Sequence, residues 1–260
     1  MQAVEKRISL FNSIAQSVIT NHDANFWLQK INPLWSVNQS LAKVVKKQTV
    51  AKDTVSLIVQ CNRHVQRGAA GQHHPVTVEI AGRHYERTYS LMQLDADHLC
   101  LTVKKVDQGL VSSWLVEQSK VGDIVYLGQP YGDMQQHIQT PNLLLLAAGS
   151  GITPFLAILR ELAKNKQIGS NKLIYSNKTS EDIIAGAELS DMLKHNFINV
   201  LTRENVVGFL DKHITRDFII EHVQDFSKPF YICGPDKFVS DMVKILVDLG
   251  AKMEALVIEH

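Results

Sequence analysis

Residues 143–154 read LLLLAAGSGITP, an apolar run that leads through two glycines to a proline. The run from Leu143 to Ala148 is typical of a strand that is buried on both faces. Gly149 and Gly151 let the backbone turn sharply, and Pro154 suits the first turn of a helix. The free N–H groups and positive dipole of that helix favour a pyrophosphate. The stretch therefore predicts either a nucleotide site or an ordinary strand–turn–helix unit.

Downstream of this turn, strand-like and helix-like apolar segments alternate. Such alternation is typical of a parallel sheet with helices on both faces, and it predicts an α/β domain over residues 139–260. The later strands are predicted at 173–175, 198–201, 230–233 and 255–258, and the helices at 154–164, around 189–193, and at 237–249.

Upstream of the turn, the pattern changes to short segments rich in β-branched residues, separated by Gly, Asn and Asp. Repeated short strands with one helix-like interruption at 112–118 predict an antiparallel β-barrel over residues 41–138. Its strands are predicted at 55–59, 75–80, 98–106 and 124–127. The polar stretch between Met134 and Pro141 is the predicted domain border.

The first 40 residues predict a helical extension. Apolar residues recur at helical spacing from Val4 to Val18, and the segment from Phe26 to Trp35 supplies large rings. We expect this extension to pack on the body of the protein. A partner-binding or membrane-lying helix is the alternative.

The charge of the chain restricts its partners. A length of 260 residues predicts two domains or one large one, and the net charge of +1 argues against a general nucleic-acid binder. Between Lys43 and Lys105, however, ten Lys/Arg stand against five Asp/Glu. This basic bias is either a solvated face or a docking surface for an acidic protein partner.

Three cysteines lie far apart and form no C-x-x-C pair, which favours a reducing compartment and argues against a disulfide framework, a Cys-ligated cluster or another metal site. Charged residues interrupt the start of the chain at Glu5, Lys6 and Arg7, so no secretory apolar core is expected there. The run Leu143–Ala148 is too short for a transmembrane segment. We expect a cytoplasmic protein.

Two further clusters suggest chemistry. Arg87-Thr88-Tyr89-Ser90 stands where a strand that alternates from Val76 onward is predicted to end. Cys233-Gly234-Pro235 follows an apolar strand and precedes a predicted helix. The cysteine cluster is either a small buried thiol at a turn or a polarizable sulfur placed beside a reacting ring.

Taken in order, these stretches resemble the signature set of the ferredoxin–NADP reductase superfamily over roughly residues 45 to 258. The resemblance implies a flavin-binding barrel followed by a nicotinamide-nucleotide domain, with FAD and NADPH or NADH as cofactors. The stretches that carry it are Arg87–Ser90, Gly109–Leu115, Gly149–Pro154 and Cys233–Pro235.

For the barrel, the resemblance implies that Arg87 neutralises the FAD pyrophosphate, that Tyr89 stacks on the isoalloxazine ring, and that Ser90 hydrogen-bonds near flavin N5. A guanidinium suits a diphosphate, and an aromatic ring gives a flat platform. Ser112 and the N–H groups of the turn around it are expected at the pyrophosphate. Lys104 lines the same groove or has a plain surface role. The remaining FAD-binding residues implied are Thr88, Val103, Gly109, Val111 and Ser113.

For the second domain, the resemblance implies that Gly149, Gly151 and Thr153 hold the nucleotide pyrophosphate, and that Cys233 with Gly234 borders the nicotinamide. Many relatives end in Glu-x-aromatic, whereas this sequence stops at Glu259-His260. Glu259 is therefore expected near the nicotinamide or as a proton relay. His260 is expected either to substitute as a shield or to leave the flavin face open.

Basic residues after the second and third strands of this domain are typical of NADPH-specific relatives. Lys178 and Arg203 stand at those places, and no carboxylate ends the second strand. We therefore expect NADPH rather than NADH, with two solvated surface cations as the alternative.

The resemblance implies an enzyme that passes hydride from NAD(P)H to FAD and single electrons to a ferredoxin or similar carrier. Ile31–Ser36 and the following barrel resemble a subgroup that serves fatty-acid desaturases. The alternatives are a reductase of flavodoxin, a haem protein, ferric chelates or free flavin, and a flavin-binding regulatory module without turnover.

Overall fold

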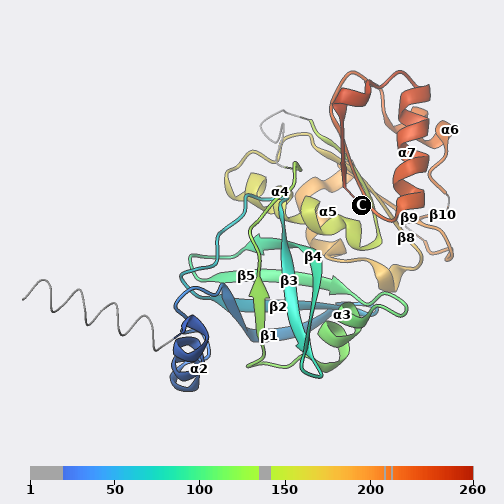
Figure 1. Ribbon diagram of the computed structural model, residues 1–260. Helices are drawn as coiled ribbons and strands as arrows, with labels where there is room; N and C mark the ends of the chain where they lie inside the picture. Colours follow the sequence, from blue (N-terminus) through green and yellow to red (C-terminus); the bar gives the residue numbers. More distant parts are fainter. Residues whose placement is uncertain (1–19, 135–141, 208, 212, 260) are drawn as a thin grey trace, which may run out of the picture.

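The computed structural model describes residues 20–134, 142–207, 209–211 and 213–259, and it places two domains against each other (Figure 1). A closed antiparallel barrel precedes a six-stranded parallel sheet, so the predicted two-domain fold class is confirmed. The predicted border at 135–141 and the helical pattern from Val4 to Val18 lie outside the described residues.

The barrel closes six strands in the order β1-β2-β5-β4-β3-β6. Closure leaves no open sheet edge, and alternate residues of each strand point inward to a single apolar core. A short helix, α3 (Leu110–Ser113), and a π-helical turn, η1 (Trp114–Gln118), follow the fifth strand, where a helical interruption was predicted. The barrel strands are β1 (Leu41–Ala51), β2 (Thr54–Cys61), β3 (His73–Ile80), β4 (Arg83–Gln93), β5 (His98–Lys104) and β6 (Ile124–Leu127).

The strand that carries Arg87 differs from the prediction. The segment expected to run from Val76 to an end near Ser90 is two strands, β3 and β4, which pair antiparallel. Ala81 and Gly82 join them with φ of 50° and 75°. Left-handed backbone at both residues of a two-residue turn matches the twist of a β-hairpin. The cluster Arg87–Ser90 therefore lies within a strand rather than at its end.

The second domain is a parallel sheet in the order β10-β9-β8-β7-β11-β12. The strand order reverses between β7 and β11, and ligands of open parallel sheets bind at the carboxyl ends of strands at such a switch point. The strands are β7 (Leu144–Ala148), β8 (Lys172–Asn177), β9 (Phe197–Leu201), β10 (Leu210–Asp211), β11 (Phe230–Cys233) and β12 (Leu256–Glu259).

Helices cover both faces of this sheet, as predicted. Alternate strand residues enter two different cores: Leu145 and Tyr175 pack with α4 and α5, whereas Leu146 and Ile174 pack with α6 and α7. The first of these cores also takes in Met134 and Ala70 from the barrel side. The helices are α4 (Ile152–Lys164), α5 (Gly186–Leu193), α6 (Arg216–His222) and α7 (Asp236–Asp248).

The described part of the extension contains the helix α2 (Asn21–Ile31), which begins with a capping box between Thr20 and Asp23. The buried amide oxygen of Asn25 accepts hydrogen bonds from the Ser36 hydroxyl and the Val37 N–H, which fixes the helix to the following segment. Among the described residues, no helix is both long enough and apolar enough to cross a membrane.

Candidate functional site

The predicted flavin residues lie along β4. Arg87 is exposed, and its Nη1 donates to the carbonyl oxygen of Glu86 at 2.6 Å. Tyr89 is half-buried against the barrel core, and burial raises the pKa of its phenol to about 12. The ring is therefore neutral at ordinary pH. A cation and a neutral aromatic ring two residues apart project from the same face of the strand.

The helix α3 lies beside β4. The Ser112 hydroxyl donates to the Gly109 carbonyl and accepts from the Val106 N–H, both at 3.2 Å. This hydroxyl is thus engaged in shaping the turn, whereas the first N–H groups of a helix have no intrahelical partner. What the turn offers an anion is its backbone. Val111 offers only its backbone as well, because its side chain is buried in the barrel core.

Val103 and Lys104, at the end of β5, have different surroundings. Val103 is 1% exposed and points into the barrel core, so its side chain is not available to a cofactor. Lys104 Nζ donates to Asp182 Oδ1 at 2.6 Å, across the domain boundary. Asp182 belongs to η3 (Ser180–Asp182). Burial alone would raise the pKa of Asp182, but hydrogen bonds from Lys104 and Thr179 hold it below its usual value.

The glycine turn follows β7 as a 3₁₀ turn, η2 (Gly149–Gly151), and leads directly into α4. Gly149 has φ of 56°, and a Cβ built there would meet no atom within 4 Å. This backbone conformation favours glycine, and the open space beside it can admit a ligand. The Thr153 hydroxyl donates to the carbonyl of Ser150 at 3.0 Å, inside the same turn.

The cysteine cluster lies directly behind the glycine turn. A Cβ at Gly151 would collide with the backbone carbonyl of Cys233, so only glycine allows this contact. Burial raises the pKa of the Cys233 thiol to about 12, and the charge of Glu259 adds to the effect. Cys233 and Glu259 are register partners on β11 and β12. The turn, the neutral thiol and the carboxylate thus share one edge of the sheet.

His73 and Tyr131, which the sequence reasoning missed, join this edge to the barrel. His73 Nδ1 lies 3.3 Å from Glu259 Oε1, and both side chains are about 15% exposed. His73 is also the register partner of Ser90. The Tyr131 ring lies edge-on to His73 at 4.6 Å, and its hydroxyl is 2.8 Å from that of Thr88.

This arrangement places the barrel cluster and the cysteine cluster on either side of one histidine–carboxylate contact. Ser90 lies beside His73 in the hairpin, and Cys233 lies beside Glu259 in the sheet. The signal that could have found His73 is the hairpin itself, because pairing Arg83 with Ile80 fixes its position opposite Ser90. The predicted role of His260 lies outside the described residues.

The two predicted cations of the nucleotide site are neighbours. The Arg203 N–H donates to the Lys178 carbonyl at 3.0 Å, and both side chains are exposed. A carboxylate accompanies them: Glu204 accepts from the Ser180 N–H at 2.6 Å, and that backbone hydrogen bond lowers its pKa. The edge therefore carries two positive charges and one negative charge.

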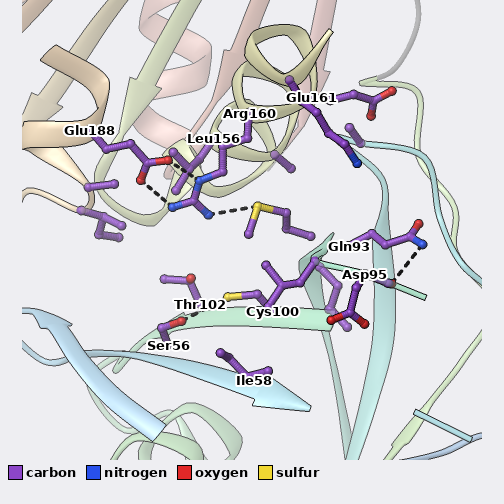
Figure 2. Close-up of a pocket in the computed structure, with 18 of the residues that line it drawn as sticks. Ser56, Ile58, Gln93, Asp95, Cys100, Thr102, Leu156, Arg160, Glu161 and Glu188 are labelled. Atoms are coloured by element: carbon purple, nitrogen blue, oxygen red, sulfur yellow. Dashed lines mark hydrogen bonds and ion pairs between the residues drawn. The ribbon is translucent and has the colours of Figure 1, made fainter. Parts of the chain in front are cut away.

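The large cavity shown in Figure 2 lies elsewhere, between the barrel and helices α4 and α5, with a volume of about 1240 Å³. Arg160 projects into it and binds Glu188 through two hydrogen bonds of 2.5 and 2.6 Å, while its Nη1 lies 3.0 Å from Met92 Sδ. Cys100 contacts the Ser56 hydroxyl at 3.1 Å on the opposite wall. None of the predicted cofactor residues lines this cavity, although on β4 its lining begins at Leu91, directly after Ser90.

The residues present fit a flavin and a nicotinamide nucleotide. On β4, an exposed guanidinium stands two residues from a partly exposed neutral ring, which suits a diphosphate joined to an aromatic system. At the sheet edge, the open space at Gly149 adjoins the N-terminus of a 13-residue helix. No group of three or more His, Cys, Asp or Glu side chains arranged for a metal ion occurs within the described ranges.

Comparison with known proteins agrees with both halves of the chain. Residues 41–136 match the oxidoreductase FAD-binding domain, and residues 145–244 match the oxidoreductase NAD-binding domain. NADH-cytochrome b5 reductase 1 of Aspergillus oryzae is 30% identical over 203 residues, covering 69% of this chain and 68% of that protein. An NADPH oxidoreductase of Mycobacterium tuberculosis is 30% identical over 248 residues, covering 92% of this chain and 64% of that protein.

Solved structures show the same architecture. The FAD/NAD-binding domain of nitric oxide dioxygenase from Vibrio cholerae superposes with a TM-score of 0.77 at 25% identity, covering 85% of this chain and 98% of that one. A ferredoxin NADP+ reductase from Neisseria gonorrhoeae, solved with FAD and NADP, gives 0.74 at 22% identity, covering 86% and 99%. The chain spans 57% of the Bacillus subtilis flavohemoprotein and 64% of the mycobacterial oxidoreductase. The chain belongs to the ferredoxin reductase-like family of flavin oxidoreductases, with an FAD-binding barrel followed by an NAD-binding domain.

Proposed function

We propose that this protein is an NAD(P)H-dependent reductase that passes electrons singly to a ferredoxin or similar carrier. The observation that supports this most is the contact between His73 and Glu259, 3.3 Å apart. It joins the barrel beside Ser90 to the sheet edge beside Cys233, the two places where the family resemblance puts a flavin and a nicotinamide. A reaction between two rings requires their binding sites to meet in this way.

The hydride and electron chemistry would be supplied by bound FAD and NAD(P)H. The protein's own groups bind, orient and exclude water. Arg87 pairs with the diphosphate, Tyr89 supports the ring, and the N–H groups of the turn at Ser112 complete the anion site. Cys233 borders the nicotinamide as a neutral thiol, so it adds no charge there. His73 and Glu259 would place an imidazole and a carboxylate close together near the reacting rings.

The proposal is tested with purified protein and added FAD. The protein should bind FAD, turn yellow, and lose its flavin absorbance when NAD(P)H is added without oxygen. Ferricyanide should then restore the colour and support turnover. Retention of FAD without turnover would favour a regulatory module, and failure to bind FAD at all would contradict the proposal.

Within this function, we propose a preference for NADPH. The adjacent exposed cations Lys178 and Arg203 support it, whereas the carboxylate of Glu204 opposes a 2′-phosphate. Lys178→Ala should lower kcat/KM for NADPH about tenfold and leave that for NADH within twofold, because only NADPH carries the phosphate. Glu204→Gln is the matched test of the opposing charge and should raise kcat/KM for NADPH. If the ratio of kcat/KM for NADPH to that for NADH is unchanged in both variants, these side chains do not determine the nucleotide preference.

The proposed acidic partner would dock on fewer basic groups than the sequence offered. Seven of the ten basic side chains from Lys43 to Lys105 already donate to partners in the chain, namely Lys47, Lys52, Arg63, Arg67, Arg87, Lys104 and Lys105. Docking would therefore rest on the others, Lys43, Lys46 and Arg83. Reduction of an acidic ferredoxin should slow as salt rises from 50 to 500 mM, on the order of tenfold. A rate independent of salt would contradict electrostatic docking.

A further inference from the structure

A buried tyrosine reaches the glycine turn from the neighbouring strand. Tyr175 of β8 is fully buried, and its hydroxyl donates to the Gly149 carbonyl at 2.9 Å. The same oxygen lies 3.4 Å from the N–H of Ile184, which precedes α5. The phenol thus connects the turn before α4 with the segment before α5. Burial raises the pKa of Tyr175 well above its ordinary value, so the hydroxyl remains a donor.

The Gly149 carbonyl determines how the turn presents its N–H groups. The oxygen of Gly149 and the N–H of Ser150 belong to one planar peptide, so fixing the direction of one fixes the other. Gly149 itself is in the left-handed region, φ 56°, where glycine has little intrinsic preference between backbone states. A turn of this kind needs an external contact to hold one orientation, and the Tyr175 hydroxyl provides it.

We propose that Tyr175 is a positioning residue for the dinucleotide: its hydroxyl holds the Gly149–Ser150 peptide in the orientation that binds the diphosphate. The inference rests on the proposed nucleotide function and deepens it. Tyr175 does not touch the ligand. It acts through the carbonyl of Gly149, and neither the glycine pattern nor the family resemblance pointed to it.

The chain contains a matched control. Tyr231 of β11 is also fully buried and belongs to the same hydrophobic core as Tyr175. Its hydroxyl is buried, yet it makes no hydrogen bond to any of the described residues. Tyr175→Phe and Tyr231→Phe therefore remove the same atom from two fully buried side chains, but only the first removes a contact with the glycine turn.

The experiment compares the two variants as full-length, FAD-loaded protein. ADP-ribose, which carries the diphosphate without the nicotinamide, is the binding probe, and adenosine 2′-monophosphate is the probe that lacks it. Tyr175→Phe should raise the Kd of ADP-ribose and the KM of NAD(P)H about three- to tenfold, the worth of one buried hydrogen bond. Its kcat with ferricyanide, its flavin content and its affinity for adenosine 2′-monophosphate should stay within twofold. Tyr231→Phe should leave all of these values unchanged.

Three results would overturn the inference: an unchanged Kd for ADP-ribose in Tyr175→Phe, an equal change in Tyr231→Phe, or an equal loss of affinity for both probes. Should Tyr175→Phe fail to fold, Gly149→Ala disturbs the same peptide from the other side. The added Cβ enters open space, but the positive φ becomes strained. This variant should weaken the binding of ADP-ribose and leave the binding of adenosine 2′-monophosphate unchanged. Failure of the wild type to bind ADP-ribose would instead overturn the proposed function.

Discussion

The barrel and the α/β domain present their candidate site residues in opposite ways. On the barrel, the candidate residues are side chains of one strand: Arg87 is exposed, and Tyr89 packs only partly against the barrel core. In the α/β domain, Gly151 and Cys233 are buried, and Gly149 leaves open space beside the backbone of the turn. Side chains that reach out suit a cofactor that stays bound, whereas a backbone cradle suits a ligand that exchanges. Substitutions in the two regions should therefore fail differently.

The largest effect is expected on the barrel, because every protein molecule that lacks FAD has no turnover at all. Arg87→Ala together with Tyr89→Ala should lower the FAD content of the purified protein by tenfold or more, because both the diphosphate partner and the ring platform are lost. The ratio of flavin to protein absorbance measures this. Arg83→Ala is the control, since Arg83 is also exposed on β4. Normal FAD content in the double variant would mean that the barrel does not hold the flavin on this strand.

The next largest effect is expected at the glycine turn, with the opposite signature. Gly151→Ala puts a methyl group against the Cys233 carbonyl and must displace the turn. We expect kcat/KM for NAD(P)H to fall by about 100-fold, or about 2.7 kcal/mol, while FAD content stays normal. Ser150→Ala, in the same turn, should change kcat/KM less than twofold. Loss of FAD from Gly151→Ala would contradict the proposal that the barrel holds FAD and the glycine turn holds NAD(P)H.

A smaller effect is expected where the two domains meet. The ion pair of Lys104 and Asp182 is largely buried, with side-chain exposures of 22% and 9%. Lys104→Met should lower the free energy of unfolding by about 1–3 kcal/mol, because it leaves the Asp182 carboxylate without its cation. Lys105→Met removes two more exposed ion pairs and should change stability little. Equal urea midpoints for all three proteins would show that the pair does not fasten the domains.

The same pair gives a pH dependence. Because the folded-state pKa of Asp182 is lowered, its stabilising contribution is present above the unfolded pKa of about 3.9 and is lost as pH falls through the folded value. Asp182→Asn should therefore lower the thermal midpoint at pH 7 and lose less stability than the wild type on acidification. Thermal scans from pH 7 to pH 3 test this. Parallel curves for both proteins would contradict it.

The smallest effect is expected at Cys233. Since the pKa of its thiol is raised to about 12, the group stays protonated between pH 6 and 9 and contributes no inflection to the pH–rate profile. Iodoacetamide at pH 8 should leave Cys233 unmodified in the folded protein, as peptide mass spectrometry would show. Cys233→Ser should shift kcat by less than tenfold. Rapid alkylation of Cys233 would mean that its thiol is more accessible to solvent than its burial in the structure indicates.

Local patterns in the sequence were enough for the fold class. The apolar run before Gly149 predicted a buried strand, and the alternation after it predicted a parallel sheet with two helical faces. Both follow from periodicity, since each residue type marks which side of its own element is buried. The hairpin at Ala81–Gly82 was missed because alternation continues on both sides of the turn. A two-residue turn that includes glycine was the available signal.

For the candidate site too, local sequence patterns identified residues but not the contacts between them. Gly151 and Cys233 were both singled out from sequence, but their contact depends on which strands are neighbours. Lys104 was expected either in the cofactor groove or in a plain surface role, and its ammonium group binds Asp182, 78 residues further along the chain. His73 carried no pattern of its own. Its proximity to Glu259 arises only when the barrel and the sheet edge meet.

By itself, the sequence determined the fold class, the family and the segments that carry its motifs, because these depend on neighbours along the chain. Only the tertiary structure decided which side chains still have free groups. The Ser112 hydroxyl, the Val103 side chain and the Lys104 ammonium are each taken up by contacts within the protein. Whether a polar or apolar group is available to a ligand depends on every partner within a few ångströms, and most of those partners are distant in sequence.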